Sequence, residues 1–198
     1  MDELDRGSTE FSGEAEQLIT RLLEARGAVR AKIAAIAKCS PVGAKTRIHG
    51  DYHLGQVLIA QDDVVIVDFE GEPARPLAER RAKSSPLRDV AGMLRSLDYA
   101  ASASLERFAA RTGDVPERIR GAATGWRNRA KRDFLDAYFA TLPGLASRVG
   151  RSGGLLDLFL LQKVFYEIAY EAANRPAWLQ IPVRGVLDLL SPEGAPRP

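Results

Sequence analysis

Residues 49 to 56 of the 198-residue sequence read His49-Gly50-Asp51-Tyr52-His53-Leu54-Gly55-Gln56, and Asp68-Phe69-Glu70-Gly71 begins twelve positions after Gln56. Short runs typical of strands surround both stretches, at residues 45–48, 57–60 and 64–67. The β-branched run at 64–67 predicts a buried strand that ends at Asp68. A carboxylate at the mouth of a buried strand needs a compensating charge, and a metal ion supplies one efficiently. These acidic residues therefore predict a metal-assisted site on a small β unit at about residues 45–69.

The spacing of these residues indicates which reaction the metal-assisted site would carry out. Protein-kinase-type catalytic loops place an aspartate, which accepts the proton of the acceptor hydroxyl, five residues before an amide that binds magnesium. A later Asp-Phe-Gly aspartate holds the metal ions at the phosphates. Asp51 lies five residues before Gln56, and Asp68 opens an Asp-Phe-Glu sequence. Glutamine in place of asparagine keeps a neutral oxygen ligand on an arm one methylene longer. The pattern predicts phosphoryl transfer.

The same residues resemble the aminoglycoside-phosphotransferase-like kinases, and within them the maltokinases, whose catalytic loop also carries glutamine and whose metal motif reads like residues 68–73. The resemblance continues through residues 75–81, 85–96, 166–171 and 174–176, and so covers nearly all of residues 14–190. It implies the C-terminal lobe of a protein kinase-like fold. It also implies transfer of a phosphoryl group from ATP, with Mg²⁺, to the anomeric hydroxyl of maltose. The product, maltose 1-phosphate, would feed α-glucan and glycogen synthesis linked to trehalose.

Roles for single residues follow from the resemblance. Asp51 is expected to be the catalytic base, and Gln56 and Asp68 to hold Mg²⁺. Supporting roles, bracing the loop or orienting ligands, are expected for His49, His53 and Glu70. Contacts to the sugar are expected from three residues at helical spacing, Tyr166, Tyr170 and Glu171. For the two tyrosines, a core position with a satisfied hydroxyl is an equally good interpretation.

The rest of the chain reads as mainly α-helical. Apolar spacing predicts a helix over 14–38 disturbed at Gly27, a helix from Ser85-Pro86 to about residue 110, and further helices over 115–141, 155–174 and 183–190. Residues 70–85 hold two prolines and no sustained period, so we expect a loop there. The predicted domain is a single lobe at 14–190 with a flexible leader at 1–13 and a tail at 191–198.

Composition excludes several classes of protein. A formal net charge of +2 is too balanced for a nucleic-acid binder, and 45% apolar residues with helical spacing argue against disorder. The most apolar stretch, residues 155–165, is too short and too polar to span a bilayer. The single cysteine, Cys39, and the acidic start favour a cytoplasmic location without nucleic-acid or membrane partners.

Other motifs are weaker. His49 and His53 have the spacing of a zinc pair, but Gly50 disfavours the helix which that pair needs. The stretch at 43–46 lacks two glycines of a phosphate-binding P-loop. A basic cluster follows the metal motif and could face phosphate, although interleaved acidic residues make a solvated, ion-paired surface the better interpretation. Its members are Arg75, Arg80, Arg81, Lys83 and Arg88.

Part of the expected kinase is not recognisable in the sequence. No glycine-rich loop or strand lysine precedes Arg47, so we expect the C-terminal lobe alone, with a nucleotide lobe in a longer parent chain, a fused neighbour or a separately encoded partner. The resemblance also implies trehalose synthase as a further candidate partner. Two hypotheses remain. The chain is a sugar-kinase lobe acting on maltose or a related sugar, or it is a non-catalytic lobe that binds a sugar or a protein partner.

Overall fold

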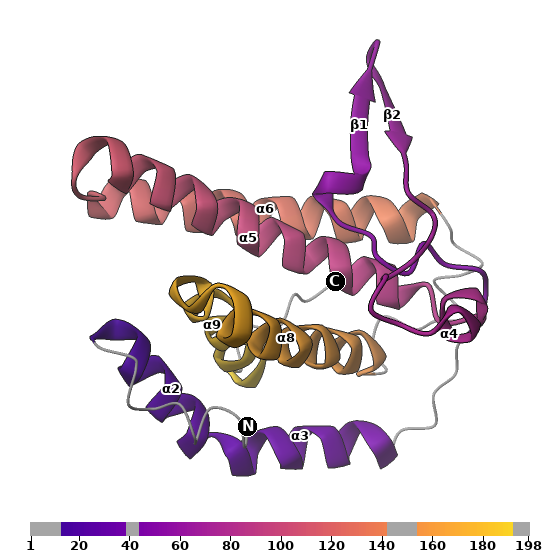
Figure 1. Cartoon of the computed structure of the whole chain (residues 1–198), viewed down its shortest axis with the longest axis horizontal. Coiled ribbons are helices and arrows are strands. Elements are labelled where there is room, and N and C mark those ends of the chain that lie inside the picture. Colours follow the sequence, from indigo (N-terminus) through magenta and orange to yellow (C-terminus); the bar gives the residue numbers. More distant parts are fainter. Residues whose placement is uncertain (1–12, 39–43, 142–153, 192–198) are drawn as a thin grey trace. The chain divides into compact units, whose positions relative to one another are not determined.

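The fold is described from a computed structural model, which describes residues 13–38, 44–141 and 154–191. The chain divides into two units, one formed by residues 1–40 with 157–195 and the other by residues 41–156 with the last three residues. We describe each unit by itself (Figure 1). Cys39, the predicted tail from residue 192 and the predicted leader up to residue 12 lie outside the described residues.

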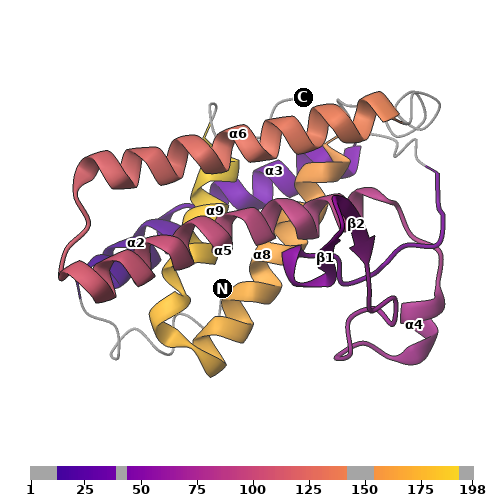
Figure 2. The same cartoon turned by 90° about the horizontal axis from the view of Figure 1, so that it is seen from above.

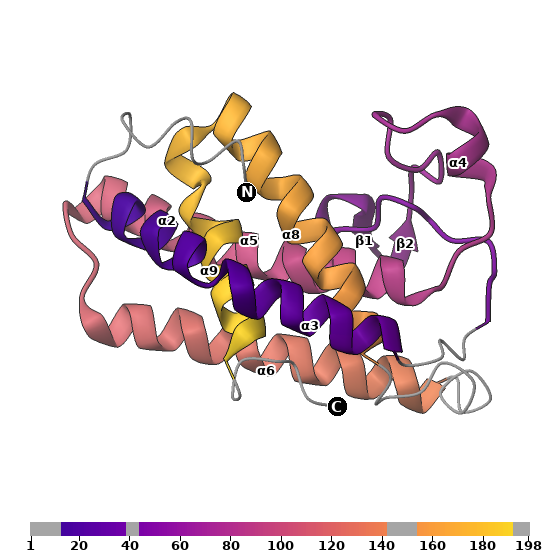
Figure 3. The same cartoon turned by 90° about the horizontal axis from the view of Figure 1, so that it is seen from below.

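The first unit is wholly helical. It contains α2 (Glu14–Glu24), α3 (Arg26–Lys38), α8 (Leu155–Asn174), a 3₁₀ turn at Pro176–Trp178 and α9 (Gln180–Leu190). Helix α2 packs against α9, as Figure 3 shows, and buries apolar residues spaced by three and four, Leu18, Ile19 and Leu22. The predicted single helix over 14–38 is wrong in one respect, because a break at Ala25 divides it into two helices. Gly27 lies inside the second helix.

The second unit holds the site. Its elements are a 3₁₀ turn η1 (Leu54–Gln56), strands β1 (Val57–Ala60) and β2 (Asp63–Ile66), and helices α4 (Leu77–Arg81), α5 (Leu87–Thr112) and α6 (Glu117–Thr141). Helices α5 and α6 lie side by side (Figure 2). Between them the buried carboxylate of Asp98 pairs with Arg95 at 2.6 Å and with Lys131 at 2.5 Å. Burial lowers the pKa of Lys131, while the Asp98 carboxylate opposes that shift.

The N-terminal end of α5 is placed by its sequence. Proline at residue 86 directly precedes the helix, and the Ser85 hydroxyl accepts a hydrogen bond from the Leu87 amide at 3.4 Å. The helix then buries Leu87, Val90 and Leu94, which share one face. The predicted start at Ser85-Pro86 is confirmed. The predicted loop at 70–85 is wrong in part, because the short helix α4 forms within it.

Strands β1 and β2 form an antiparallel hairpin in which Val57 pairs with Ile66 and Ala60 with Asp63. The two-residue turn needs positive φ at both positions, and Gln61 and Asp62 have φ of 50° and 65°. The prediction that residues 64–67 form a buried strand is wrong: the side chain of Val64 is 58% exposed. The β-branched side chains of residues 64–67 favour a strand, but the strand would be buried only if another layer of structure covered it. In the described part of the chain, the hairpin has no third strand.

The predicted strand at 45–48 reduces to one bridge, in which Thr46 pairs with Ser84. The outcome is a mainly α fold with a small two-stranded sheet. No helix in the described ranges combines the length and the apolar character that a membrane span requires.

Candidate active site

The loop at 49–56 is fixed to helix α5 through the backbone. The Asp89 carboxylate accepts hydrogen bonds from the amides of His49 at 2.7 Å and Gly50 at 2.9 Å. The Ser96 hydroxyl accepts a third from the Leu54 amide at 2.8 Å. Bonds to a carboxylate are stronger than neutral ones, so Asp89 is the main anchor of the loop.

Between these two anchors, Gly92 lets the loop approach the helix closely. A Cβ atom at this position would lie 2.5 Å from the Tyr52 carbonyl oxygen. Asp89, Gly92 and Ser96 are spaced by three and four residues, so all three lie on the face of α5 that meets the loop. Asp89 is one of the acidic residues interleaved with the basic cluster, for which the sequence favoured a solvated, ion-paired surface. That interpretation is wrong, and the shared face of these three residues is the signal that could have identified their role.

His49 links the loop to the segment that follows β2. Its side chain is buried, with Nε2 2.8 Å from the Val67 carbonyl oxygen and Nδ1 3.4 Å from the Asp51 amide nitrogen. A carbonyl oxygen can only accept and an amide can only donate, so the ring carries its proton on Nε2 and accepts at Nδ1. Its ring also lies 4.9 Å from the ring of Phe69, centroid to centroid. With both nitrogens engaged, His49 acts as a brace between the two segments.

The expected metal ligands meet in space. The Gln56 side-chain amide donates to the Asp68 carboxylate at 2.9 Å, and the Val67 amide donates to the Gln56 carbonyl at 3.0 Å. Asp68 is exposed and has a φ of 64°. The predicted position of Asp68 at the end of a buried strand is therefore wrong, because β2 is exposed along its length. What brings Asp68 to Gln56 is the pairing of β1 with β2.

These oxygen donors fit a magnesium ion. Magnesium binds one or two protein carboxylates and completes its shell with water and substrate phosphates. Asp68 supplies a carboxylate, and rotation of the Gln56 amide would present its oxygen instead of its nitrogen. Within the described ranges, no group of three or more His, Cys, Asp or Glu side chains could hold a metal. The donor set therefore suits a cation held jointly with a phosphate ligand.

His53 lies near Asp51, whereas Glu70 lies beside Arg80. The Asp51 carboxylate is 3.9 Å from His53 Nε2, and His53 Nδ1 accepts a hydrogen bond from the Gly55 amide at 3.0 Å, which caps η1. The Glu70 side chain is exposed, 3.8 Å from the Arg80 guanidinium. The expected roles of His53 and Glu70 stay predictions.

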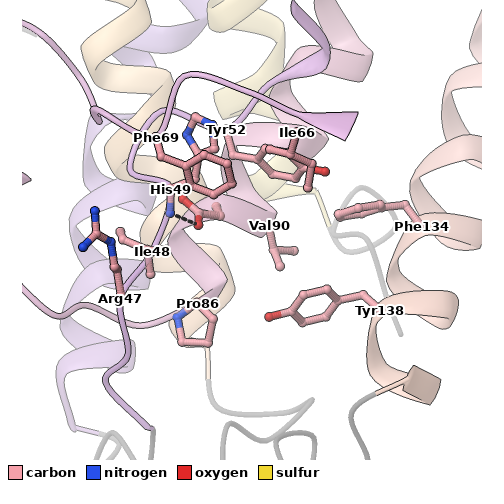
Figure 4. Close-up of a pocket in the computed structure, with 11 residues that line it drawn as sticks. Arg47, Ile48, His49, Tyr52, Ile66, Phe69, Pro86, Val90, Phe134 and Tyr138 are labelled. Atoms are coloured by element: carbon pink, nitrogen blue, oxygen red, sulfur yellow. Dashed lines mark hydrogen bonds between the residues drawn. The ribbon is translucent and has the colours of Figure 1, made fainter. Parts of the chain in front are cut away.

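A cavity of about 580 Å³ lies beside the loop (Figure 4). His49, Tyr52 and Phe69 line it from the loop side, and Phe134 and Tyr138 line it from α6. Burial raises the pKa of both tyrosine hydroxyls, and the Asp89 charge adds to the shift. The lining of the cavity is mainly apolar and includes none of Asp51, Gln56 and Asp68. These three residues, the polar cluster, therefore lie outside the cavity.

The three residues expected to contact a sugar belong to the other unit. The rings of Tyr166 and Tyr170 stack with centroids 6.4 Å apart, and both are exposed. Glu171 is buried and holds Arg175 through two bonds, at 2.7 and 2.9 Å. The Arg175 guanidinium lies 5.4 Å from the centroid of the Tyr170 ring and 4.8 Å from that of Trp178. Sequence reasoning did not assign roles to Arg175 and Trp178.

The fold and the polar cluster are consistent with a family of phosphotransferases, and the sequence matches the model of one such family. The model of the phosphotransferase enzyme family (APH) matches residues 6–122, more than half of the chain, and the chain belongs to this family. It is 35% identical to a glucosamine kinase of Streptacidiphilus jiangxiensis over 144 residues, which are 72% of this chain and 31% of that protein. It is 36% identical to a glucosamine kinase of Mycolicibacterium smegmatis (strain ATCC 700084 / mc(2)155) over 135 residues, 68% of this chain and 32% of that protein.

A solved structure of a glucosamine kinase is also similar to this chain. A glucosamine kinase in complex with glucosamine, ADP and inorganic phosphate matches with a TM-score of 0.72 at 30% identity, over 96% of this chain and 43% of that one. The chain thus spans about a third of the length of the curated relatives it matches. The kinase-like class expected from the motifs is confirmed. The relatives are glucosamine kinases, so a maltose acceptor stays a proposal.

Proposed function

We propose that this chain is the acceptor-side lobe of an ATP-dependent sugar kinase, with Asp51 as the base that receives the proton of the sugar hydroxyl. The observation that carries the proposal is the contact of Gln56 with Asp68 at 2.9 Å. Gln56 belongs to the same loop, residues 49–56, as Asp51. The anchoring by Asp89 and His49 supports it, because a catalytic base needs a fixed backbone to meet its substrate within hydrogen-bond distance.

Gln56 and Asp68 would hold Mg²⁺ in this function. When bound, the ion bridges and neutralises the phosphates of the nucleotide. The chain's own residues keep the two ligands within contact of each other, through the β1–β2 pairing and the bond between the Val67 amide and the Gln56 carbonyl. A nucleotide lobe supplied by another polypeptide segment would complete the cleft.

The sugar contacts are proposed on Tyr166, Tyr170, Arg175 and Trp178. The exposed rings of Tyr166 and Tyr170 and the half-buried ring of Trp178 offer flat apolar faces to a sugar. The Arg175 guanidinium offers several donors to its hydroxyls. Glu171 is buried and bonded to Arg175 twice, so its role would be to position that guanidinium rather than to contact the sugar.

Two acceptors follow from different observations. The sequence motifs resemble those of maltokinases and favour maltose, which would give maltose 1-phosphate. The relatives are glucosamine kinases and favour glucosamine as the second candidate.

The test measures ADP release from ATP and Mg²⁺ with maltose or with glucosamine. The chain is assayed alone and with the part of the S. jiangxiensis glucosamine kinase that lies outside the matched segment. We expect turnover with one sugar in the supplemented mixture, and its loss by at least about a thousandfold in Asp51→Asn, because the base is removed. The sugar that is turned over identifies the acceptor. Sugar binding without Asp51-dependent turnover in any mixture would overturn the proposal in favour of a non-catalytic binding lobe.

A further inference from the structure

A second, smaller pocket lies behind the loop, on the side of the basic cluster. Its volume is about 160 Å³, and it is bounded by the loop, the segment after the metal motif, α4 and the first turn of α5. Its lining shares no residue with the Asp51, Gln56 and Asp68 cluster. The residues that line it are Ile48, Gly50, Gly71, Glu72, Arg75, Glu79, Arg80, Ala82, Lys83, Ser84 and Arg88.

Positive charge dominates this pocket, with four cationic side chains and two carboxylates in its lining. Arg75 pairs with Glu79 at 3.3 Å. Among the described residues, no carboxylate lies within ion-pair distance of Arg88. Burial lowers the pKa of Arg88, and the charge of Arg75 lowers it further, while the carboxylates of Asp89, Glu79 and Glu72 oppose the shift. The pocket therefore concentrates cations in a partly desolvated place, where a bound anion would gain most.

Arg80 carries a second, independent sign of a missing ligand. Its Nε atom is buried and has no hydrogen-bond acceptor in the part of the chain that the structure describes. The same guanidinium donates to the Glu70 carbonyl through Nη1 at 3.3 Å. Buried donors normally have a partner, and one without a protein acceptor indicates a bound water or ion.

We propose that this pocket is a binding site for a phosphate group, separate from the phosphoryl-transfer site. Guanidinium groups match phosphate oxygens with paired donors. The four cations of the lining outnumber its two carboxylates, with Arg75 paired to Glu79 and Arg80 lying 3.8 Å from the Glu70 carboxylate outside the lining. The volume is below the range of pockets for drug-sized ligands, so it admits a phosphate group and leaves the rest of a larger ligand outside.

A phosphate bound in this pocket would contact both the loop at 49–56 and the segment that follows the metal motif. Gly50 and Gly71 form part of its wall, and a Cβ on Gly50 would lie 3.2 Å from the Gly71 Cα, so the two backbones are nearly in contact. Arg88 adjoins Asp89, the anchor of the loop, and Arg80 holds the carbonyl of Glu70 beside the metal motif. A phosphate joining Arg80 to Arg88 would fasten the loop to the metal motif.

The test titrates the whole chain with inorganic phosphate and, separately, with glucose 6-phosphate, following binding by calorimetry and amide NMR. We expect saturable binding with shifts of the Gly50 and Gly71 amides. Arg88→Gln and Arg80→Gln should each weaken binding by about tenfold or more, since each removes a charged donor pair. Arg81→Gln is the matched control, because Arg81 is an exposed neighbour that does not line the pocket.

The two titrations distinguish the source of the phosphate. Tighter binding of glucose 6-phosphate supports a phosphate ester as the ligand, and equal or tighter binding of inorganic phosphate supports the free ion. If the Arg88→Gln variant fails to fold, the phosphate affinity of the Arg80→Gln variant still tests the proposal. The proposal is overturned if neither ligand saturates, if acetate binds as well as phosphate, or if Arg81→Gln weakens binding as much as the two pocket variants. Turnover of a sugar is not part of this test, so its outcome is independent of the proposed kinase activity.

Discussion

The loop at 49–56 and the β1–β2 hairpin that follows it are adjacent in sequence but are held in different ways. The loop is bonded to a helix 40 residues further along the chain, through Asp89. The hairpin is held by its own ladder and leaves Ile59 84% exposed. The position of Asp51 therefore depends on α5, whereas the exposed side chains of the hairpin contribute little to the stability of this chain.

The largest effect is expected from Asp89→Ala. It removes both acceptors of the His49 and Gly50 amides and should lower the free energy of unfolding by about 4 kcal/mol. Asp89→Asn keeps one acceptor and should lose about half as much. Urea denaturation of the three proteins measures both values. An Asp89→Ala protein as stable as the wild type would show that the loop is not held by this carboxylate.

A smaller loss is expected from Gly92→Ala, which places a methyl group against the Tyr52 carbonyl oxygen. The loop must move away from α5, at a cost of about 3 kcal/mol. The control is Gly121→Ala on α6, where nothing lies within 4 Å of the new Cβ. That change should stabilise by about 0.5–1 kcal/mol, because alanine is the better helix former. Thermal unfolding of the pair gives the comparison, and shifts of the same sign would contradict the close approach.

The hairpin should respond much less. Ile59→Thr keeps a β-branched side chain at an exposed position and should change the free energy of unfolding by less than about 0.5 kcal/mol. Val90→Thr makes the same kind of change at a site that is 1% exposed on α5, and should cost about 1–3 kcal/mol because it buries a hydroxyl. Chemical denaturation of both variants tests the contrast. Equal losses of stability in Ile59→Thr and Val90→Thr would contradict the contrast between hairpin and helix.

The smallest effect concerns alkaline pH. The folded chain raises the pKa of Tyr138 above its ordinary value of 10.0, mainly by burial. The folded state therefore keeps this proton longer than the unfolded state, and the associated stability is present below pH 10.0 and is lost as the pH rises through the folded pKa. Tyr138→Phe should make stability fall less steeply above pH 10.0. Unfolding midpoints measured from pH 9 to 11, on about a half-unit grid, would show identical slopes if Tyr138 were not involved.

Local signals in the sequence predicted much of this arrangement. The spacing from Asp51 to Gln56 and Asp68 identified the pair that the structure brings into contact, and Ser85-Pro86 placed the start of α5. The partner of the loop was not predicted, because periodicity shows which residues share a helix face but not what that face meets. Exposure of the hairpin was missed for a related reason, since β-branched residues favour a strand whether or not another layer covers it.

Asp68 has a backbone conformation that glycine adopts freely and that costs other residues about 1–2 kcal/mol. Asp68→Gly would therefore relieve strain at the same position where it removes the carboxylate that Gln56 contacts. A library of this chain selected only for heat resistance would be drawn to glycine at residue 68. At this residue, directed evolution for robustness and retention of the polar cluster act against each other, so a useful screen must read out both.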